Sequence, residues 1–123
     1  MTETPKRMTY SSVVGRKTVC LALNIAALNN LQVKVGDVIN AYVTAPCSEK
    51  IWTVLEKEFG ADQGKKDIIV RALYGLKSSG AAFHAHLADC MSSIGYTPCR
   101  GDNDLWMKPD IDPDEDEYYS YIL

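Results

Sequence analysis

An aspartate within an apolar strand pattern is the first feature of the sequence that could do chemistry. Leu31, Val33 and Val35 alternate with polar residues, as in a half-buried strand, and Asp37 falls on the apolar side of that pattern. Burying an ionised carboxylate is costly unless a cation, a metal or hydrogen-bond donors meet it. We therefore expect Asp37 either to cap a turn where the strand leaves the core or to bind a ligand, and the pattern alone leaves both open.

Two further stretches carry residues of interest. Tyr42 follows Asp37 within VGDVINAYVTAP, where its simplest interpretation is a packed aromatic. The segment ALYGLKSSG holds Tyr74, and in it Gly75 and Gly80 bracket Lys77. Glycines on either side of a short polar stretch are typical of a turn between a strand and a helix, and a lysine at such a turn is ordinarily solvated.

The segment GADQGKKD loosely resembles a phosphate-binding loop. Gly60, Gly64 and Lys65 imitate its glycines and lysine, but the glycine spacing is one residue short. Lys66 also stands where a serine or threonine would hold magnesium. A hairpin turn is the better interpretation of this segment.

The spacing of apolar residues predicts two helices that would position these residues. The first follows Ser11 or Ser12 as N-cap, becomes regular near Arg16 and ends at Asn29 and Asn30. The second begins at Ser78 or Ser79 and ends at Gly95, with an apolar face made of Phe83, Leu87, Cys90, Met91 and Ile94. We expect both helices to pack on one face of a sheet.

Five segments have the composition or alternation of strands, and we expect a mostly antiparallel sheet in an α+β fold. They are residues 31–38, 50–55, 67–73, 104–108 and 118–123. The second and third form a hairpin over residues 50–73. The last two are joined by the acidic loop of residues 110–117, which we interpret as a solvated hairpin tip.

The composition of the 123 residues fits one globular domain, in which we expect residues 1–10 to be disordered. The formal net charge of −3 comes from the acidic loop, because the rest of the chain holds 13 basic and 10 acidic residues. That mildly basic remainder permits a nucleic-acid partner without indicating one. No stretch approaches the length of a membrane helix, and the N-terminus lacks an apolar signal core, so we expect an intracellular protein, cytoplasmic or nuclear, that does not contact a membrane.

Three blocks resemble the reverse transcriptase of copia-type LTR retrotransposons. Residues 9–46 resemble the segment from fingers to palm that includes the polymerase A motif, and residues 68–87, with Tyr-Gly-Leu-Lys, resemble the B motif. DLWMK followed by YYSYIL resembles the run that leads into the C motif, Tyr-Val-Asp-Asp. The resemblance covers nearly all of residues 9–123, and the order and spacing of the first two motifs are specific.

The resemblance implies a role for each candidate residue. Asp37 matches the catalytic aspartate of the A motif, and its carboxylate together with the backbone carbonyl of Val38 would bind Mg²⁺. Tyr42 matches the steric gate, whose ring fills the space that a ribose 2′-hydroxyl would need. Tyr74 and Gly75 match positions that line the nascent base pair, and Lys77 matches a contact to template or phosphate.

The resemblance also implies a fold and partners. We expect a partial polymerase palm with part of the fingers, acting on an RNA or DNA template-primer and deoxynucleotides, next to other segments of a Pol polyprotein in a virus-like particle. The second and third catalytic aspartates of the family would come just after Leu123. The complete enzyme would hold two Mg²⁺ ions, which we do not expect to bind tightly to this chain by itself, and we expect the chain alone to be inactive. The alternative is a non-catalytic retrotransposon remnant that binds nucleic acid, or a protein partner through its last strand.

Overall fold

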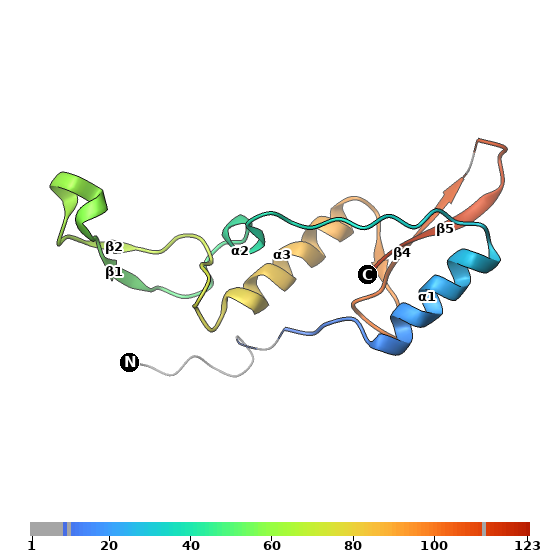
Figure 1. Ribbon diagram of the computed structural model, residues 1–123, viewed down its shortest axis with the longest axis horizontal. Coiled ribbons are helices and arrows are strands. Elements are labelled where there is room, and N and C mark those ends of the chain that lie inside the picture. The colour runs from blue at the N-terminus through green and yellow to red at the C-terminus, as the bar shows by residue number, and fades with distance from the viewer. Residues whose placement is uncertain (1–8, 10, 112) are drawn as a thin grey trace. The chain divides into compact units, whose positions relative to one another are not determined.

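The computed structural model describes residue 9, residues 11–111 and residues 113–123. Figure 1 shows the order of the elements, which mixes helices with antiparallel strands and confirms the α+β class. They are α1 (Arg16–Leu28), α2 (Ala41–Thr44), β1 (Trp52–Val54), the 3-10 helix η2 (Lys57–Asp62), β2 (Lys66–Ile68), α3 (Ser79–Ser93), β3 (Thr97–Pro98), β4 (Trp106–Ile111) and β5 (Glu117–Ile122).

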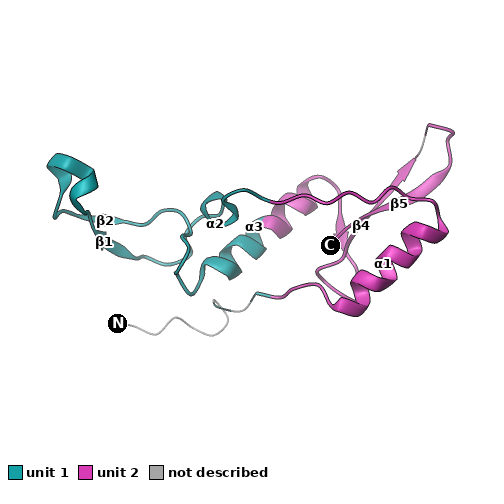
Figure 2. Cartoon of the chain, in the orientation of Figure 1, with its two compact units in different colours: residues 1–11, 38–86 teal, residues 12–37, 87–123 magenta. Residues whose placement is uncertain are grey.

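The chain divides into two compact units (Figure 2). Unit 1 comprises residues 1–11 and 38–86, and unit 2 comprises residues 12–37 and 87–123. The prediction of disorder for residues 1–10 lies outside the described residues, apart from Thr9. Among the described residues, no helix combines the length and the apolar composition that crossing a membrane requires.

A two-stranded hairpin forms the first half of unit 1. β1 pairs antiparallel with β2, with Trp52 opposite Ile68 and Val54 opposite Lys66. The pairing continues as far as Leu55, whose N–H donates to the carbonyl of Lys65 over 2.9 Å. The predicted hairpin is therefore confirmed, but its strands are shorter than residues 50–55 and 67–73. η2 lies in the connection between them, and beyond Ile68 an isolated bridge at Arg71 and single backbone hydrogen bonds take the place of a continuous strand.

The base of this hairpin holds two buried residues of unit 1. The N–H of Ala72 donates to the carbonyl of Ala45 over 3.0 Å, and both alanines are buried. Next to them, Pro46 and Arg71 form an antiparallel bridge, and the Arg71 guanidinium donates to the carbonyl of Thr44. These contacts join residues 44–47 to residues 70–72, so that two segments distant in sequence become neighbours.

The second predicted helix is confirmed as α3, which ends where Gly95 was expected to stop it. Gly95 has φ +89°, and its N–H donates to the carbonyl of Ser92. The N–H of Tyr96 donates to the carbonyl of Met91, which completes the hydrogen-bond pair of a Schellman motif. A residue with a Cβ would strain this left-handed position, which explains the glycine.

Unit 2 contains a three-stranded antiparallel sheet in the order β3-β4-β5. β4 and β5 pair along their whole lengths, from Trp106 opposite Ile122 to Ile111 opposite Glu117. The predicted hairpin is confirmed, but its first strand covers residues 106–111 and not 104–108, so that Asp110, Ile111 and Glu117 belong to strands and not to the loop predicted over residues 110–117. The loop between them is exposed at residues 113–116, and Asp112 lies outside the described residues. The short strand β3 was not predicted, because its two residues carry no alternation to recognise.

The first helix, α1, begins at Arg16 as predicted, but neither Ser11 nor Ser12 caps it. Its N-cap is Gly15, which has no side chain to accept the free N–H groups. The Asp102 carboxylate lies at this end of the helix and accepts from the N–H of Gly15 itself over 3.0 Å and from the Thr18 hydroxyl over 2.6 Å. A carboxylate at this end also interacts favourably with the helix dipole.

The strand predicted over residues 31–38 is wrong. These residues have no regular secondary structure, and Val33 and Val35 are 60% and 97% exposed. Alternating apolar and polar residues make a segment suitable for a sheet, but a strand forms only where another strand supplies its hydrogen bonds. Among the described residues, no strand pairs with this segment.

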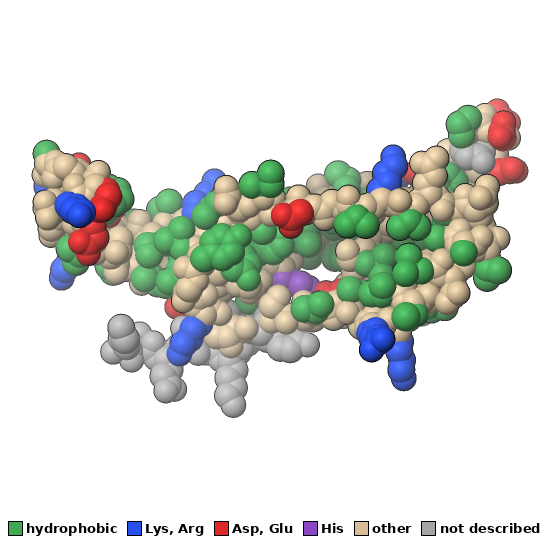
Figure 3. Space-filling model, in the orientation of Figure 1, with side chains coloured by type: hydrophobic (Ala, Val, Ile, Leu, Met, Phe, Trp, Pro, Cys, Tyr) green, Lys and Arg blue, Asp and Glu red, His purple; other side chains and the backbone are tan. Residues whose placement is uncertain are grey.

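Both units expose much of their apolar surface. Among the described residues, the buried apolar side chains are Ala45, Ala72 and Leu105. α1 was expected to pack on a face of a sheet, but it has no buried residue, and Leu28 is 86% exposed. Figure 3 shows apolar side chains at the surface over the described parts of the molecule. The helices and strands therefore depend largely on hydrogen bonds within and beside them.

The Asp102 contact predicts a pH dependence. Hydrogen bonds from Thr18, Gly15 and Asp104, with Thr18 contributing most, hold the pKa of Asp102 below its usual value. A carboxyl whose folded-state pKa is depressed stabilises the fold above its unfolded pKa of about 3.9, and this stability is lost as pH falls through the folded value. Urea unfolding of unit 2 at a series of pH values should show such a loss below about pH 4.

Asp102→Asn should reduce the loss of unfolding free energy below about pH 4 and lower that free energy at neutral pH. The carboxamide cannot replace a carboxylate that accepts several hydrogen bonds. Asp89→Asn is the matched control, since Asp89 is an exposed carboxylate on α3. If both variants lose the same unfolding free energy at acid pH, Asp102 does not stabilise the fold through its depressed pKa.

Candidate nucleotide site

Three aromatic rings from separate segments meet in unit 1. The ring centroids of Tyr42, in α2, and Tyr74, in the loop before α3, are 4.6 Å apart and tilted by 41°. The Phe83 ring, on α3, meets Tyr42 edge-on with 6.2 Å between centroids. These separations lie within the range in which aromatic pairs attract each other. Tyr42 is half-buried between its neighbours, whereas Tyr74 is 65% exposed.

The backbone contacts at the hairpin base position the two tyrosines. Tyr42 lies three residues before Ala45, and Tyr74 lies two residues after Ala72, so the Ala72–Ala45 hydrogen bond sets the distance between their segments. The Ser79 hydroxyl donates to the carbonyl of Leu73, which ties the Tyr74 loop to the start of α3. The loop is thus held at both ends.

Gly75 occupies a conformation that favours glycine. Its φ is +94°, and a Cβ built at this position would meet no atom within 4 Å. The requirement for glycine therefore comes from the backbone angle and not from crowding. The space beside it is open.

Asp37 and Val38 lie in the irregular segment before α2, and both are exposed. The predicted placement of Asp37 on the buried side of a strand is therefore wrong, because no strand forms there. Asp37 belongs to unit 2 and Val38 to unit 1. Lys77 is exposed in the turn that leads into α3.

Within the described part of the chain, no three His, Cys, Asp or Glu side chains are grouped closely enough to hold a metal ion. A pair of Mg²⁺ ions needs carboxylates from more than one position. Asp37, exposed and outside any such group, does not fit that requirement by itself. We therefore derive no catalytic step through magnesium from these residues.

Phe83 is a site residue that the sequence pattern did not single out. The 3.6-residue periodicity assigned it to the apolar face of the second helix, which is correct but does not say which ring it contacts. Its partner Tyr42 lies in a different segment, so the contact depends on the fold. The one feature of the sequence that could have indicated this residue is its position one turn after the start of that helix.

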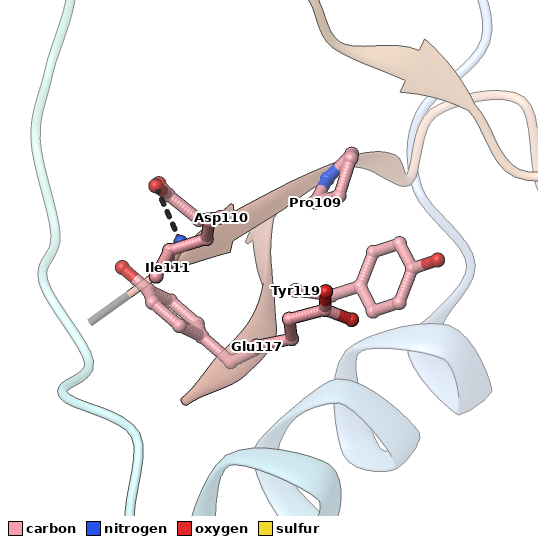
Figure 4. A pocket seen from close by; sticks show the side chains of 6 residues that line it. Pro109, Asp110, Ile111, Glu117 and Tyr119 are labelled. Atoms are coloured by element: carbon pink, nitrogen blue, oxygen red, sulfur yellow. Dashed lines mark hydrogen bonds between the residues drawn. The ribbon is translucent and has the colours of Figure 1, made fainter. Parts of the chain in front are cut away.

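A hollow of about 420 Å³ lies on the hairpin of unit 2 (Figure 4). In it, the Asp110 carboxylate accepts a hydrogen bond from the N–H of Ile111 over 3.0 Å. None of the residues predicted to bind nucleotide or metal lines this hollow, which is formed by Pro109, Asp110, Ile111, Glu117, Tyr118 and Tyr119. It is therefore separate from the aromatic cluster of unit 1.

Comparison of the chain with models of protein families, with curated proteins and with solved structures gives no match.

The backbone at Gly75 supports a prediction about unit 1. Gly75→Ala should destabilise unit 1 by about 1 kcal/mol, because a side chain is disfavoured at positive φ even where space is open. Hydrogen exchange at the Ala72 amide should speed up by about fivefold, which corresponds to that free energy. Gly36→Ala is the control, since a Cβ there also meets no atom within 4 Å and its φ is not positive. Equal exchange in the two variants would show that the φ of Gly75 carries no cost.

Proposed function

We propose that the chain is part of an RNA-directed DNA polymerase of the copia-type retrotransposon class, with its palm and part of its fingers. The observation that carries the proposal is the contact between Tyr42 and Tyr74. The resemblance places these residues in two separate motifs that would face the same incoming nucleotide. A nucleotide site built from both motifs requires their rings to be close, and they are 4.6 Å apart.

The exposed ring of Tyr74 and the open space beside Gly75 suit a flat nucleobase. Tyr42 is held between Tyr74 and Phe83, so its ring has little freedom to move away from a sugar. A fixed ring is what a steric gate needs, because rejection of a ribose 2′-hydroxyl depends on a clash that cannot be relieved. Lys77, exposed nearby in sequence, supplies a cation for phosphate or template.

In this proposal Asp37 is one ligand of the Mg²⁺ pair, with the carbonyl of Val38, and the other carboxylates come from outside the described residues. The part played by this chain is to orient the nucleotide through Tyr42, Tyr74 and Gly75. Template-primer and deoxynucleotides are the proposed partners.

Primer extension tests the role of Asp37. With Mg²⁺ present, we expect no extension by the 123-residue chain, and extension by a longer polypeptide that adds an Asp-Asp pair, fingers strands and a thumb. In the active polypeptide, Asp37→Asn should lower the rate by on the order of 10³-fold, because a metal ligand supplies several kcal/mol of transition-state stabilisation. Asp89→Asn should leave the rate unchanged. Extension by the 123-residue chain itself would refute the argument from missing ligands.

Sugar discrimination tests Tyr42 separately. Tyr42→Ala should raise the incorporation of ribonucleotides relative to deoxynucleotides in the same active polypeptide, because the ring that blocks the 2′-hydroxyl is gone. Tyr42→Phe keeps the ring and should keep the discrimination. If Tyr42→Ala discriminates as the unmodified enzyme does, Tyr42 is not the gate.

A further inference from the structure

The hairpin of unit 1 has one face that is open and carries a cation. Residues directly opposite each other on antiparallel strands share a face, so Trp52, Val54, Ile68 and Lys66 lie together. Trp52 is 63% and Val54 is 52% exposed. Thr53 and its partner residue on β2 lie on the other face, because side chains alternate along a strand.

A hollow of about 510 Å³ lies at these strands, lined by three residues of this face, Trp52, Val54 and Lys66, and also by Thr53. Lys66 is diagonal to Trp52 in the register, a separation that long side chains can span. The negative charge of β2 is directed elsewhere: Asp67 is on the opposite face, where its carboxylate accepts from the N–H of Ile68 over 2.8 Å. The neighbouring Lys65 is paired with Asp62. The open face therefore presents an indole ring and a lysine together.

We propose that this face binds a single strand of nucleic acid, with a base stacked on Trp52 and the adjoining phosphate contacted by Lys66. A flat aromatic ring beside a cation is the combination by which proteins bind single strands without reading sequence. An apolar protein surface is a poorer occupant, because it would remove water from the Lys66 ammonium without supplying a negative charge. A phosphodiester supplies that charge.

The inference deepens the proposed function, since a template is a nucleic-acid strand, but it does not depend on catalysis. The hairpin face contains no residue assigned to the metal or to the nucleotide. Binding of an oligonucleotide by the 123-residue chain can therefore succeed where primer extension by any longer polypeptide fails.

Tryptophan fluorescence tests the stacking in the chain as it exists. The chain has two tryptophans, Trp52 on the open face and Trp106, half-buried in β4. A ~12-nucleotide oligothymidylate, which is within the usual site size for such binding, should quench the fluorescence saturably. The quenching should persist in Trp106→Phe and disappear in Trp52→Phe, whose remaining tryptophan serves as the internal control. Comparison of the unmodified chain with Trp52→Phe gives the same answer if Trp106→Phe does not fold.

Lys66 and Lys65 provide a matched pair for the phosphate contact. Lys66→Gln should weaken binding by about fivefold and lower the slope of log affinity against log salt by about 0.7. Lys65→Gln removes the same charge one residue away, from the opposite face, and should change neither quantity appreciably.

Two outcomes overturn the inference. One is the absence of quenching at Trp52 at low salt, which would leave this face to a protein partner. The other is an equal effect of Lys66→Gln and Lys65→Gln, which would reduce the binding to general charge. Oligonucleotide binding together with an inactive longer polypeptide would instead contradict the proposed polymerase and leave this inference standing.

Discussion

Unit 1 depends on the antiparallel contact that joins residues 44–47 to residues 70–72. The N–H of Ala72 donates to Ala45, the N–H of Cys47 donates to Val70, and the guanidinium of Arg71 donates to Thr44. Buried backbone groups must be paired, and this contact pairs them at two buried residues of the unit. The hairpin lies on one side of this contact, between residues 47 and 70 of the chain. Tyr42 and Tyr74 lie on its other side, before residue 44 and after residue 72. One local constraint therefore organises both proposed binding surfaces.

Unit 2 shows the same reliance on polar contacts. Its three-stranded sheet leaves Leu105 as the buried apolar side chain among the described residues of that unit. Two acidic side chains from the segment before β4 contact the N-terminal end of α1. Asp102 accepts from the Gly15 N–H and the Thr18 hydroxyl, and Asp104 accepts from the Ser12 hydroxyl. These contacts link residues far apart in sequence and hold the helix where little apolar packing does so.

The two errors of the sequence interpretation share one cause. Ser11 and Ser12 have the side chain of an N-cap, but the N-cap residue is Gly15, whose N–H donates to Asp102. Residues 31–38 have the alternation of a strand, but no strand pairs with them among the described residues. In both cases the local pattern was compatible with the prediction, but a distant segment decided the outcome. At the helix that segment supplies Asp102, and at residues 31–38 no strand is present to pair with them among the described residues.

What the sequence determined by itself was local: the two long helices, the Gly95 stop, the two hairpins and the need for glycine at a turn through Tyr74 and Gly75. Short-range hydrogen bonds and backbone angles depend on neighbouring residues, so composition and spacing suffice to predict them. The tertiary structure alone decided that Tyr42 meets Tyr74 and Phe83, that Asp102 contacts Gly15 at the start of α1, and that Trp52 stays exposed beside Lys66. These facts depend on which distant segments become neighbours, and periodicity within a segment does not encode its partner.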